Sequence, residues 1–198
     1  VMGGGQTTGD TIGNGRASAL LYAREGAHVV VADRDLDSAK DTAERITDEG
    51  GVAVAVAVDA TRRDECERAA SLCEERFGRV DILHNNVGIG VNDSGLTSIR
   101  EEDWDHILAV NLKSVLMPCK AVIPRMRQQG AGAIVNISSA AAVSNTPMVA
   151  YKTSKAGVNA MTQQLAMTNA RFGIRANCIM PGLMDTPMAI DGFSAARG

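Results

Sequence analysis

Tyr151 and Lys155 stand four residues apart in a segment that we predict to be a helix, so their side chains share one face. A free tyrosine ionises near pH ~10, and a nearby cation favours its phenolate form. A serine hydroxyl, from Ser138 or Ser139, follows the apolar strand before this helix and could hold an alcohol or carbonyl oxygen. These residue types suit proton transfer coupled to redox chemistry between an alcohol and a carbonyl.

A glycine-rich run near the start of the chain could bind a pyrophosphate. It precedes a helix that we expect to begin near Arg16. Glycines let a backbone approach phosphate closely, and a helix N-terminus offers free N–H groups and positive partial charge. The residues that we assign to this phosphate site are Gly3, Gly5, Gly13, Asn14 and Gly15.

An acidic residue at the end of the next predicted strand extends this site. Asp33 lies 18 residues after Gly15. A carboxylate there can accept both ribose hydroxyls of an adenosine, and it repels a 2′-phosphate. We therefore predict NAD as the cofactor rather than NADP, although the neighbouring Arg34 favours NADP. The alternative for Asp33 is a helix-capping acid.

The composition favours a globular, reduced, cytoplasmic protein. Of 198 residues, 45% are hydrophobic, and the net charge is −3 with no basic run, so we expect no nucleic-acid partner. We find no apolar stretch long enough to cross a membrane and no secretory leader, and we expect no membrane partner. The four scattered cysteines read as reduced thiols, and the three histidines lack ligand spacing, so we expect no metal.

Predicted strands and helices alternate along the chain. We expect strands at 29–32, 52–58, 80–83, 133–139 and 174–179, the second of them buried on both faces. We expect helices from about residue 16 and at 36–49, 61–77, 99–128 (in one piece or two) and 150–171. This order predicts parallel strands joined by crossover helices, within one domain spanning 1–198.

Taken together, these features resemble the short-chain dehydrogenase/reductase family in its simple single-domain form. The matching pieces, in the family order, are the glycine run, Asp33, Asp59-Ala60-Thr61, Asn85-Asn86-Val87-Gly88, Asn111, Ile137-Ser138-Ser139, Tyr151-x-x-x-Lys155 and the run from Pro181 to Thr186. The resemblance implies an α/β Rossmann fold, a doubly wound parallel sheet with helices on both faces. It also implies reversible hydride transfer between a nicotinamide cofactor and a small-molecule secondary alcohol or ketone.

The resemblance further implies a role for each matching residue. Tyr151 would be the acid/base, Lys155 would hold the nicotinamide ribose and lower the pKa of Tyr151, and Ser139 would position the substrate oxygen. Asn111 would hold a water that links Lys155 to solvent, unless it only satisfies a helix kink. The cofactor-binding residues would be the five of the glycine run, Tyr151 and Lys155, together with Asp33, Arg34, Asp59, Ala60, Asn85, Val87, Gly88, Pro181, Gly182 and Thr186. Of these, Asn85 could instead form a turn and Thr186 could cap a helix.

Two departures from the family pattern concern the site. The segment from Gln6 to Ile12 lengthens the glycine run, and we expect it to project near the cofactor phosphates or the mouth of the site. The motif gives Ser139 as the catalytic serine, whereas a spacing of 13 residues before Tyr151 gives Ser138. Successive strand side chains point to opposite faces, so only one can serve, and we favour Ser139.

Both ends of the chain also depart from the pattern. Val1 stands where the first strand should end, and Gly198 follows soon after Thr186. We therefore expect a fragment, or the ordered part, of a longer protein that carries most of the first strand and a C-terminal substrate-covering segment.

The substrate itself is not readable from the sequence. The loop from Gly90 to Ser98 has only one charge, Asp93, which favours an uncharged substrate. A homo-oligomer, dimer or tetramer, with contacts through the 99–128 and 150–171 helices is a family expectation. Two alternative functions are a non-catalytic NAD-binding sensor or scaffold, and a relative of the sugar epimerases and dehydratases.

Overall fold

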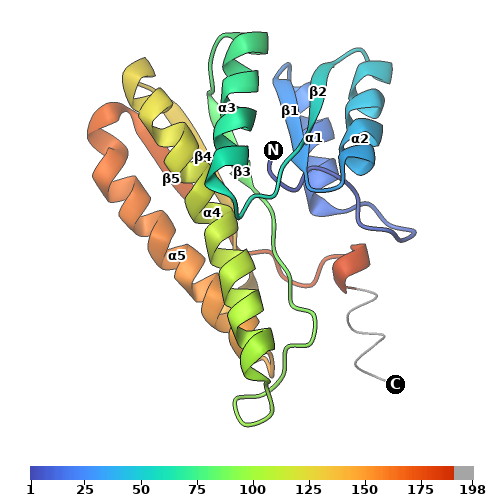
Figure 1. Cartoon of the computed structure of the whole chain (residues 1–198), viewed down its shortest axis with the longest axis vertical. Coiled ribbons are helices and arrows are strands. Elements are labelled where there is room, and N and C mark those ends of the chain that lie inside the picture. Colours follow the sequence, from blue (N-terminus) through green and yellow to red (C-terminus); the bar gives the residue numbers. More distant parts are fainter. Residues whose placement is uncertain (190–198) are drawn as a thin grey trace.

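A twisted parallel sheet forms the centre of the computed structural model, which describes residues 1–189 (Figure 1). Its strands are β1 (His28–Asp33), β2 (Val52–Ala57), β3 (Ile82–Asn85), β4 (Gly132–Ile137) and β5 (Ile174–Ile179). β1 pairs with β2, and β3, β4 and β5 pair in that order, all in parallel. Met2 bridges Ala32 on one side and Asn85 on the other, so the two halves join at the start of the chain.

Five helices cover the two faces of this sheet. They are α1 (Asn14–Arg24), α2 (Leu36–Asp48), α3 (Arg63–Phe77), α4 (Glu101–Gln129) and α5 (Val149–Asn169). α1 and α2 pack together against β1 and β2, while α3, α4 and α5 lie side by side on the other face (Figure 1). Each face has its own apolar core, one centred on Val31 and Ile46 and the other on Ile134 and Met126. The predicted doubly wound α/β fold is confirmed.

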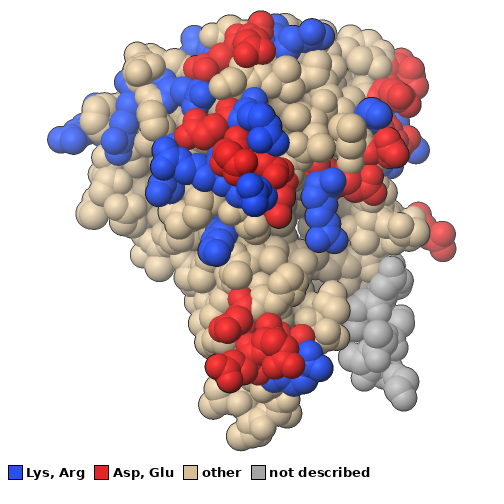
Figure 2. All heavy atoms as spheres, in the orientation of Figure 1, with Lys and Arg blue, Asp and Glu red and all other residues tan. Residues whose placement is uncertain are grey.

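Local signals in the sequence account for where most helices begin and end. The side chain of Asp35 accepts hydrogen bonds from two N–H groups in the first turn of α2, and Gly78 and Gly130 end α3 and α4 with positive φ. Glu101, Glu102 and Asp103 gather at the start of α4, where the helix dipole favours negative charge (Figure 2). α4 runs as one continuous helix, although it contains Pro118 and Pro124.

One expectation about burial was wrong. β2 was predicted to be buried on both faces, but it is the edge strand of the sheet and Val52 at its start is 45% exposed. Alternating Val and Ala cannot distinguish an edge strand from a central one. By length and composition alone, α4 could cross a membrane, because an 18-residue window of it has a mean hydropathy of 1.4. Half of that window is buried inside the protein, which is typical of a core helix.

The carboxyl ends of all the strands meet at one edge of the sheet. The chain leaves Met2 towards β1 and β2, and then crosses back to β3 on the opposite side of Met2. In open α/β sheets, ligands bind outside the carboxyl edge at such a reversal of strand order. Asp33, Asn85 and Ser139 all lie at or just beyond the carboxyl ends of their strands.

Candidate active site

Lys155 projects from α5 into an almost closed environment. It is 3% exposed, and its Nζ donates a hydrogen bond to the carbonyl of Ile137 at 2.9 Å. The same Nζ lies 5.5 Å from the centre of the Tyr151 ring. Burial disfavours the charged form and lowers the pKa of Lys155 from 10.5 to about 8. The sequence correctly indicated that the two side chains share one face of a helix.

The phenol of Tyr151 is only partly buried and lies beside Ser139. Burial raises the pKa of Tyr151 above its ordinary value, and hydrogen bonding with Ser139 acts in the opposite direction. The Lys155 ammonium is bonded to the carbonyl of Ile137, and its own pKa is depressed.

Ser138 and Ser139 point in opposite directions, as neighbouring residues of an extended chain must. Ser138 is 2% exposed, and its hydroxyl donates to the carbonyl of Lys155 at 2.9 Å. Ser139 caps the short 3₁₀ turn Ala140–Ala142, accepting from the N–H of Ala141 at 3.1 Å, and its hydroxyl is close to the phenol. The geometry therefore favours the serine that the motif gives over the one that the spacing gives.

Asn111 ties α4 to the loop that follows β3. Its Oδ1 accepts from the N–H of Ile89 at 2.7 Å, and its Nδ2 donates to the carbonyl of Ile89 and to Oγ of Ser154, both at 2.9 Å. Both ends of the side-chain amide are thus engaged with protein groups. α4 is continuous through Asn111.

The glycine run turns tightly and brings the start of α1 against Gly3. Gly3 has a φ of +73°, which favours glycine, and a Cβ at Gly15 would overlap the carbonyl oxygen of Gly3. Nδ2 of Asn86 donates to the same carbonyl at 3.1 Å. α1 then begins at Asn14, and the N–H groups of its first turn have no partner within the helix.

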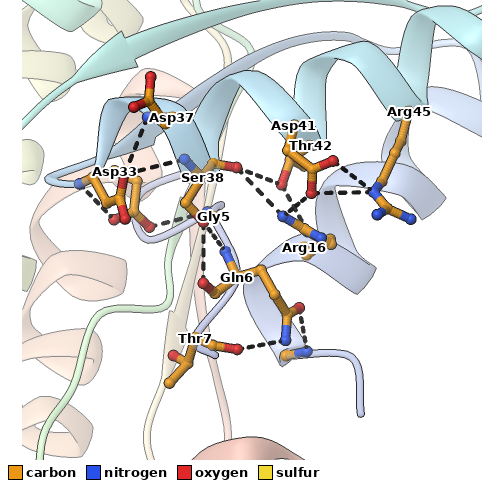
Figure 3. Close-up of polar contacts among 12 residues, drawn as sticks. Gly5, Gln6, Thr7, Arg16, Asp33, Asp37, Ser38, Asp41, Thr42 and Arg45 are labelled. Carbon is orange, nitrogen blue, oxygen red and sulfur yellow. Dashed lines mark hydrogen bonds and ion pairs between the residues drawn. The ribbon is translucent and has the colours of Figure 1, made fainter. Parts of the chain in front are cut away.

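Asp33 holds the glycine run in place rather than capping α2 (Figure 3). Its two carboxylate oxygens accept from the N–H groups of Gly5 at 3.0 Å and Asp35 at 3.1 Å. Ser38 lies beside it, and the Ser38 hydroxyl donates to the carbonyl of Gln6 at 3.1 Å. Because Asp35 caps α2, the alternative reading of Asp33 as a helix cap was wrong.

The residues expected around the adenine lie at the ends of β1 and β2. Asp59 is exposed, and its Oδ1 accepts from Oγ1 of Thr61 at 2.7 Å. Hydrogen bonds from Thr61 lower the pKa of Asp59, with smaller contributions from Arg62 and Arg34. Ala60 beside Asp59 is buried.

Asn85 does not point toward the expected cofactor crevice. It is 1% exposed, and its Nδ2 donates to Oδ1 of Asn136 on β4 at 2.9 Å, inside the sheet. Its role under a ribose was therefore wrongly predicted, and the idea of a simple turn former does not describe it either. The next residue, Asn86, faces the glycine run instead. Strand alternation predicts that Asn85 and Asn86 point to opposite faces, but not which of the two faces the glycine run.

Two further segments line the same edge of the sheet. Val87 contacts Gly3, and a Cβ at Gly88 would lie 2.8 Å from Nζ of Lys155, so the backbone passes close to that amine. The carbonyl of Pro181 accepts from the N–H of Ala140 at 2.8 Å. Gly182 is exposed and has open space around it, while Thr186 is 8% exposed and begins a turn of helix. Thr186 therefore lies at the start of a helical turn, which is consistent with the alternative that it caps a helix.

The extra segment of the glycine run forms a closed loop. Gln6 joins its two ends, because Nε2 donates to the carbonyl of Thr11 at 2.8 Å and Oε1 accepts from the N–H of Gly13 at 2.9 Å. At its tip, a Cβ at Gly9 would lie 2.8 Å from Cβ of Pro187. The loop therefore reaches the segment that follows β5. In residues 1–189 there is no group of three or more potential metal ligands.

Comparisons with known proteins identify the family. The sequence model of the short chain dehydrogenases matches residues 7–196. A 3-oxoacyl-[acyl-carrier-protein] reductase of Thermotoga maritima is 38% identical over 185 residues, covering 91% of this chain and 74% of that protein. A 7alpha-hydroxysteroid dehydrogenase of Clostridium sardiniense is 39% identical over 191 residues, covering 94% and 72%. The crystal structure of a short-chain dehydrogenase/reductase from Burkholderia xenovorans superposes with a TM-score of 0.92 at 39% identity, covering 99% and 78%.

This chain belongs to the short-chain dehydrogenase/reductase family, whose members are oxidoreductases that use a nicotinamide cofactor. The residues at the carboxyl edge fit such a dinucleotide. Few atoms lie beside the position where a Cβ on Gly13 would stand, so a ligand has room to approach this backbone. The first N–H groups of α1 are available to a pyrophosphate. Gly182 likewise has open space where a Cβ would stand, which leaves room just after β5.

Proposed function

We propose that this protein transfers a hydride between a nicotinamide cofactor and a secondary alcohol or ketone, with Tyr151 as the acid/base. The observation that carries the proposal is the grouping of a partly buried phenol, the Ser139 hydroxyl and the Lys155 ammonium beyond the carboxyl edge of the sheet. In this arrangement the charge of the ammonium and that of the phenol can each affect the pKa of the other group.

Each side chain has a distinct part in the reaction. In the oxidative direction Tyr151, as phenolate, removes the proton of the substrate hydroxyl, and in the reductive direction it returns that proton to the oxygen. Ser139 holds the same oxygen by a hydrogen bond. Lys155 would bind the ribose next to the nicotinamide, and Asn111 fixes the loop after β3 beside it. When bound, the nicotinamide would supply or accept the hydride.

The cofactor that we propose is NAD. Its support is the Asp33 carboxylate at the end of β1, which can accept ribose hydroxyls and repels a 2′-phosphate. Arg34 is the residue that favours NADP. Similar solved structures include both an NAD⁺-bound xylitol dehydrogenase and a gluconate 5-dehydrogenase from Burkholderia cenocepacia in complex with NADP and tartrate. The proposal for NAD therefore rests on Asp33 alone.

The proposed substrate is an uncharged alcohol or ketone. The one charge of the Gly90–Ser98 loop, on Asp93, is used in hydrogen bonds to backbone N–H groups. Val91 and Leu96 of the same loop are 71% and 76% exposed, so the loop also presents apolar surface. A charged substrate would find no unused counter-charge in this loop.

We also propose a cytoplasmic homo-oligomer. The four cysteines, all within the described residues, are free thiols, as is usual in a reducing compartment. On α5, Ala156 and Ala160 are exposed and small enough for close helix contact, whereas Gly157 packs against Leu112 of the same chain. α4 and α5 are therefore the surfaces that we propose for contact between subunits.

A dinucleotide assay tests the function and separates it from the alternative of a sensor. NADH and NADPH binding would be measured by fluorescence, and turnover by dinucleotide absorbance with a panel of secondary alcohols and ketones. We expect tighter binding of NADH and turnover of at least one uncharged substrate. Binding without turnover of any member of a broad panel would favour the sensor, and absence of binding would overturn both.

A further inference from the structure

The first turn of α5 carries Tyr151 and lacks a cap from its own sequence. Helix starts leave N–H groups without intrahelical partners, and the preceding side chain usually accepts from them. The residue in that position is Met148, whose side chain makes no such bond. The regular hydrogen bonding of the helix begins only with the N–H of Lys152, which donates to the carbonyl of Met148.

The missing acceptors come from a loop that lies far away in the sequence. One carboxylate oxygen of Asp93 accepts from the N–H of Tyr151 at 2.6 Å, and the other accepts from the N–H of Ala150 at 3.2 Å. The carbonyl of Ser94 accepts from the N–H of Val149 at 3.1 Å. Three successive N–H groups of the turn are thus satisfied by two adjacent residues. A carboxylate is favoured there because the helix dipole is positive at this end.

The same loop is also held on its other side and pressed against the phenol ring. Ile89 is fixed through both its N–H and its carbonyl by Asn111, at 2.7 and 2.9 Å. At the next residue, a Cβ on Gly90 would lie 3.3 Å from Cδ2 of Tyr151 and 2.7 Å from Cε of Met148. The loop therefore connects two anchors, Asn111 on α4 and the N-terminus of α5, across the face of the ring.

We propose that Asp93 is a positioning residue for Tyr151, holding the backbone of that residue so that its phenol stays beside Ser139. The proposal rests on the proposed function of Tyr151 as the acid/base. The bond from Asp93 goes to the N–H of Tyr151 itself, so the location of the reacting oxygen depends on it directly. A displacement of about 1 Å at a reacting group can cost about 100-fold in rate.

The test compares Asp93→Ala and Asp93→Asn with Asp81→Asn. Asp81 is an exposed carboxylate paired with Arg79 at 2.7 Å, at the opposite edge of the sheet, so its variant controls for the loss of one charge. Three quantities would be measured for each protein: kcat and KM with a substrate found in the panel, the dissociation constant for the dinucleotide, and amide hydrogen exchange at Ala150 and Tyr151.

For Asp93→Ala we expect kcat to fall by about 10- to 100-fold with the dissociation constant for the dinucleotide nearly unchanged, and the Tyr151 amide to exchange faster. Asp93→Asn should recover part of kcat, because its side-chain oxygen still accepts one of the two hydrogen bonds. Asp81→Asn should change none of the three quantities. If Asp93→Ala does not fold, Asp93→Asn and Asp93→Ser carry the same comparison.

Two results would overturn the inference. One is faster exchange at the Tyr151 amide with kcat within about twofold of the unaltered protein, because a lost anchor would then leave catalysis intact. The other is a parallel fall in kcat and dinucleotide binding that follows the unfolded fraction, which is what a purely structural cap predicts. A Tyr151→Phe variant that keeps its turnover would refute the proposed function instead, while the exchange data would still report on the Asp93 anchor.

Discussion

The Nζ of Lys155 lies 5.5 Å from the centre of the Tyr151 ring while donating its hydrogen bond elsewhere, to a backbone carbonyl. In the protein without a dinucleotide, burial therefore dominates the titration of the phenol. Tyr151 should ionise above its ordinary pKa of 10.0, and Ser139→Ala should raise that pKa further, because a hydrogen bond that lowers it is lost.

This titration can be measured directly because the chain has only two tyrosines. In a Tyr22→Phe background, the ultraviolet absorbance of phenolate would report Tyr151 alone. A pKa at or below 10.0 in the free protein would show that Lys155 already offsets burial without the cofactor, against the expectation.

Substitution of Ser139 should mainly affect catalysis, whereas substitution of Ser138 should mainly affect stability. Ser139→Ala removes the hydroxyl beside the phenol and should lower kcat by about 100-fold, with little effect on stability. Ser138→Ala removes a buried hydrogen bond to the carbonyl of Lys155 and should lower the free energy of unfolding by about 1 kcal/mol, with a smaller effect on kcat. Steady-state kinetics and urea unfolding of both variants check this pair, and the reverse pattern would move the catalytic role to Ser138.

Two glycines of the phosphate loop should respond very differently to alanine. At Gly15 a Cβ would overlap the carbonyl oxygen of Gly3, and relieving that overlap should cost about 3 kcal/mol or more of unfolding free energy. At Gly13 the nearest atom to a Cβ is Oε1 of Gln6, at 3.6 Å, and φ is an ordinary −75°, so alanine should be tolerated. Denaturant unfolding of the two variants is the measurement, and equal stabilities would contradict the packing of α1 described above.

Acid should destabilise the fold through a buried histidine. His84 is 3% exposed, and burial lowers its pKa from 6.5 to about 4. Between these pH values the unfolded chain binds more protons, so stability rises with pH across this window and is lost as pH falls. The full effect is on the order of 3 kcal/mol.

In a His84→Gln variant, the free energy of unfolding should depend less on pH over this range. The Gln side chain still offers an acceptor to the Tyr22 hydroxyl, which lies 3.0 Å from Nδ1 of His84. Urea unfolding of both proteins at neutral pH and near pH ~4 gives the comparison, since the groups they share cancel. Parallel curves for the two proteins would mean that His84 is not the group responsible.

Much of the fold could be predicted because its signals are local. The apolar run after His28, the cap at Asp35 and the helix-ending glycines at 78 and 130 each act within a few residues. The same holds for Tyr151 and Lys155, whose spacing alone puts them on one helix face. Local signals did not reveal that β2 is an edge strand, because that depends on which strand the chain places beside it.

The parts of the site that could not be predicted depend on the direction of a side chain or on distant contacts. Asn85 and Asn86 are identical in type, and only the register with β4 decides which one enters the core. Nothing in the sequence indicated that the amide of Asn111 is bonded to Ile89 and Ser154. Asp93 gave no local sign of its partners, which lie 57 and 58 residues later in the chain.

The role of Tyr151 as acid/base is tested most directly by Tyr151→Phe, with Tyr22→Phe as the matched control for loss of a phenol. We expect Tyr151→Phe to lower turnover by at least about 100-fold and to leave the dissociation constant for the dinucleotide nearly unchanged, while Tyr22→Phe keeps its turnover. Turnover by Tyr151→Phe within about tenfold of the unaltered protein, or about 1.4 kcal/mol of barrier, would contradict the proposed mechanism.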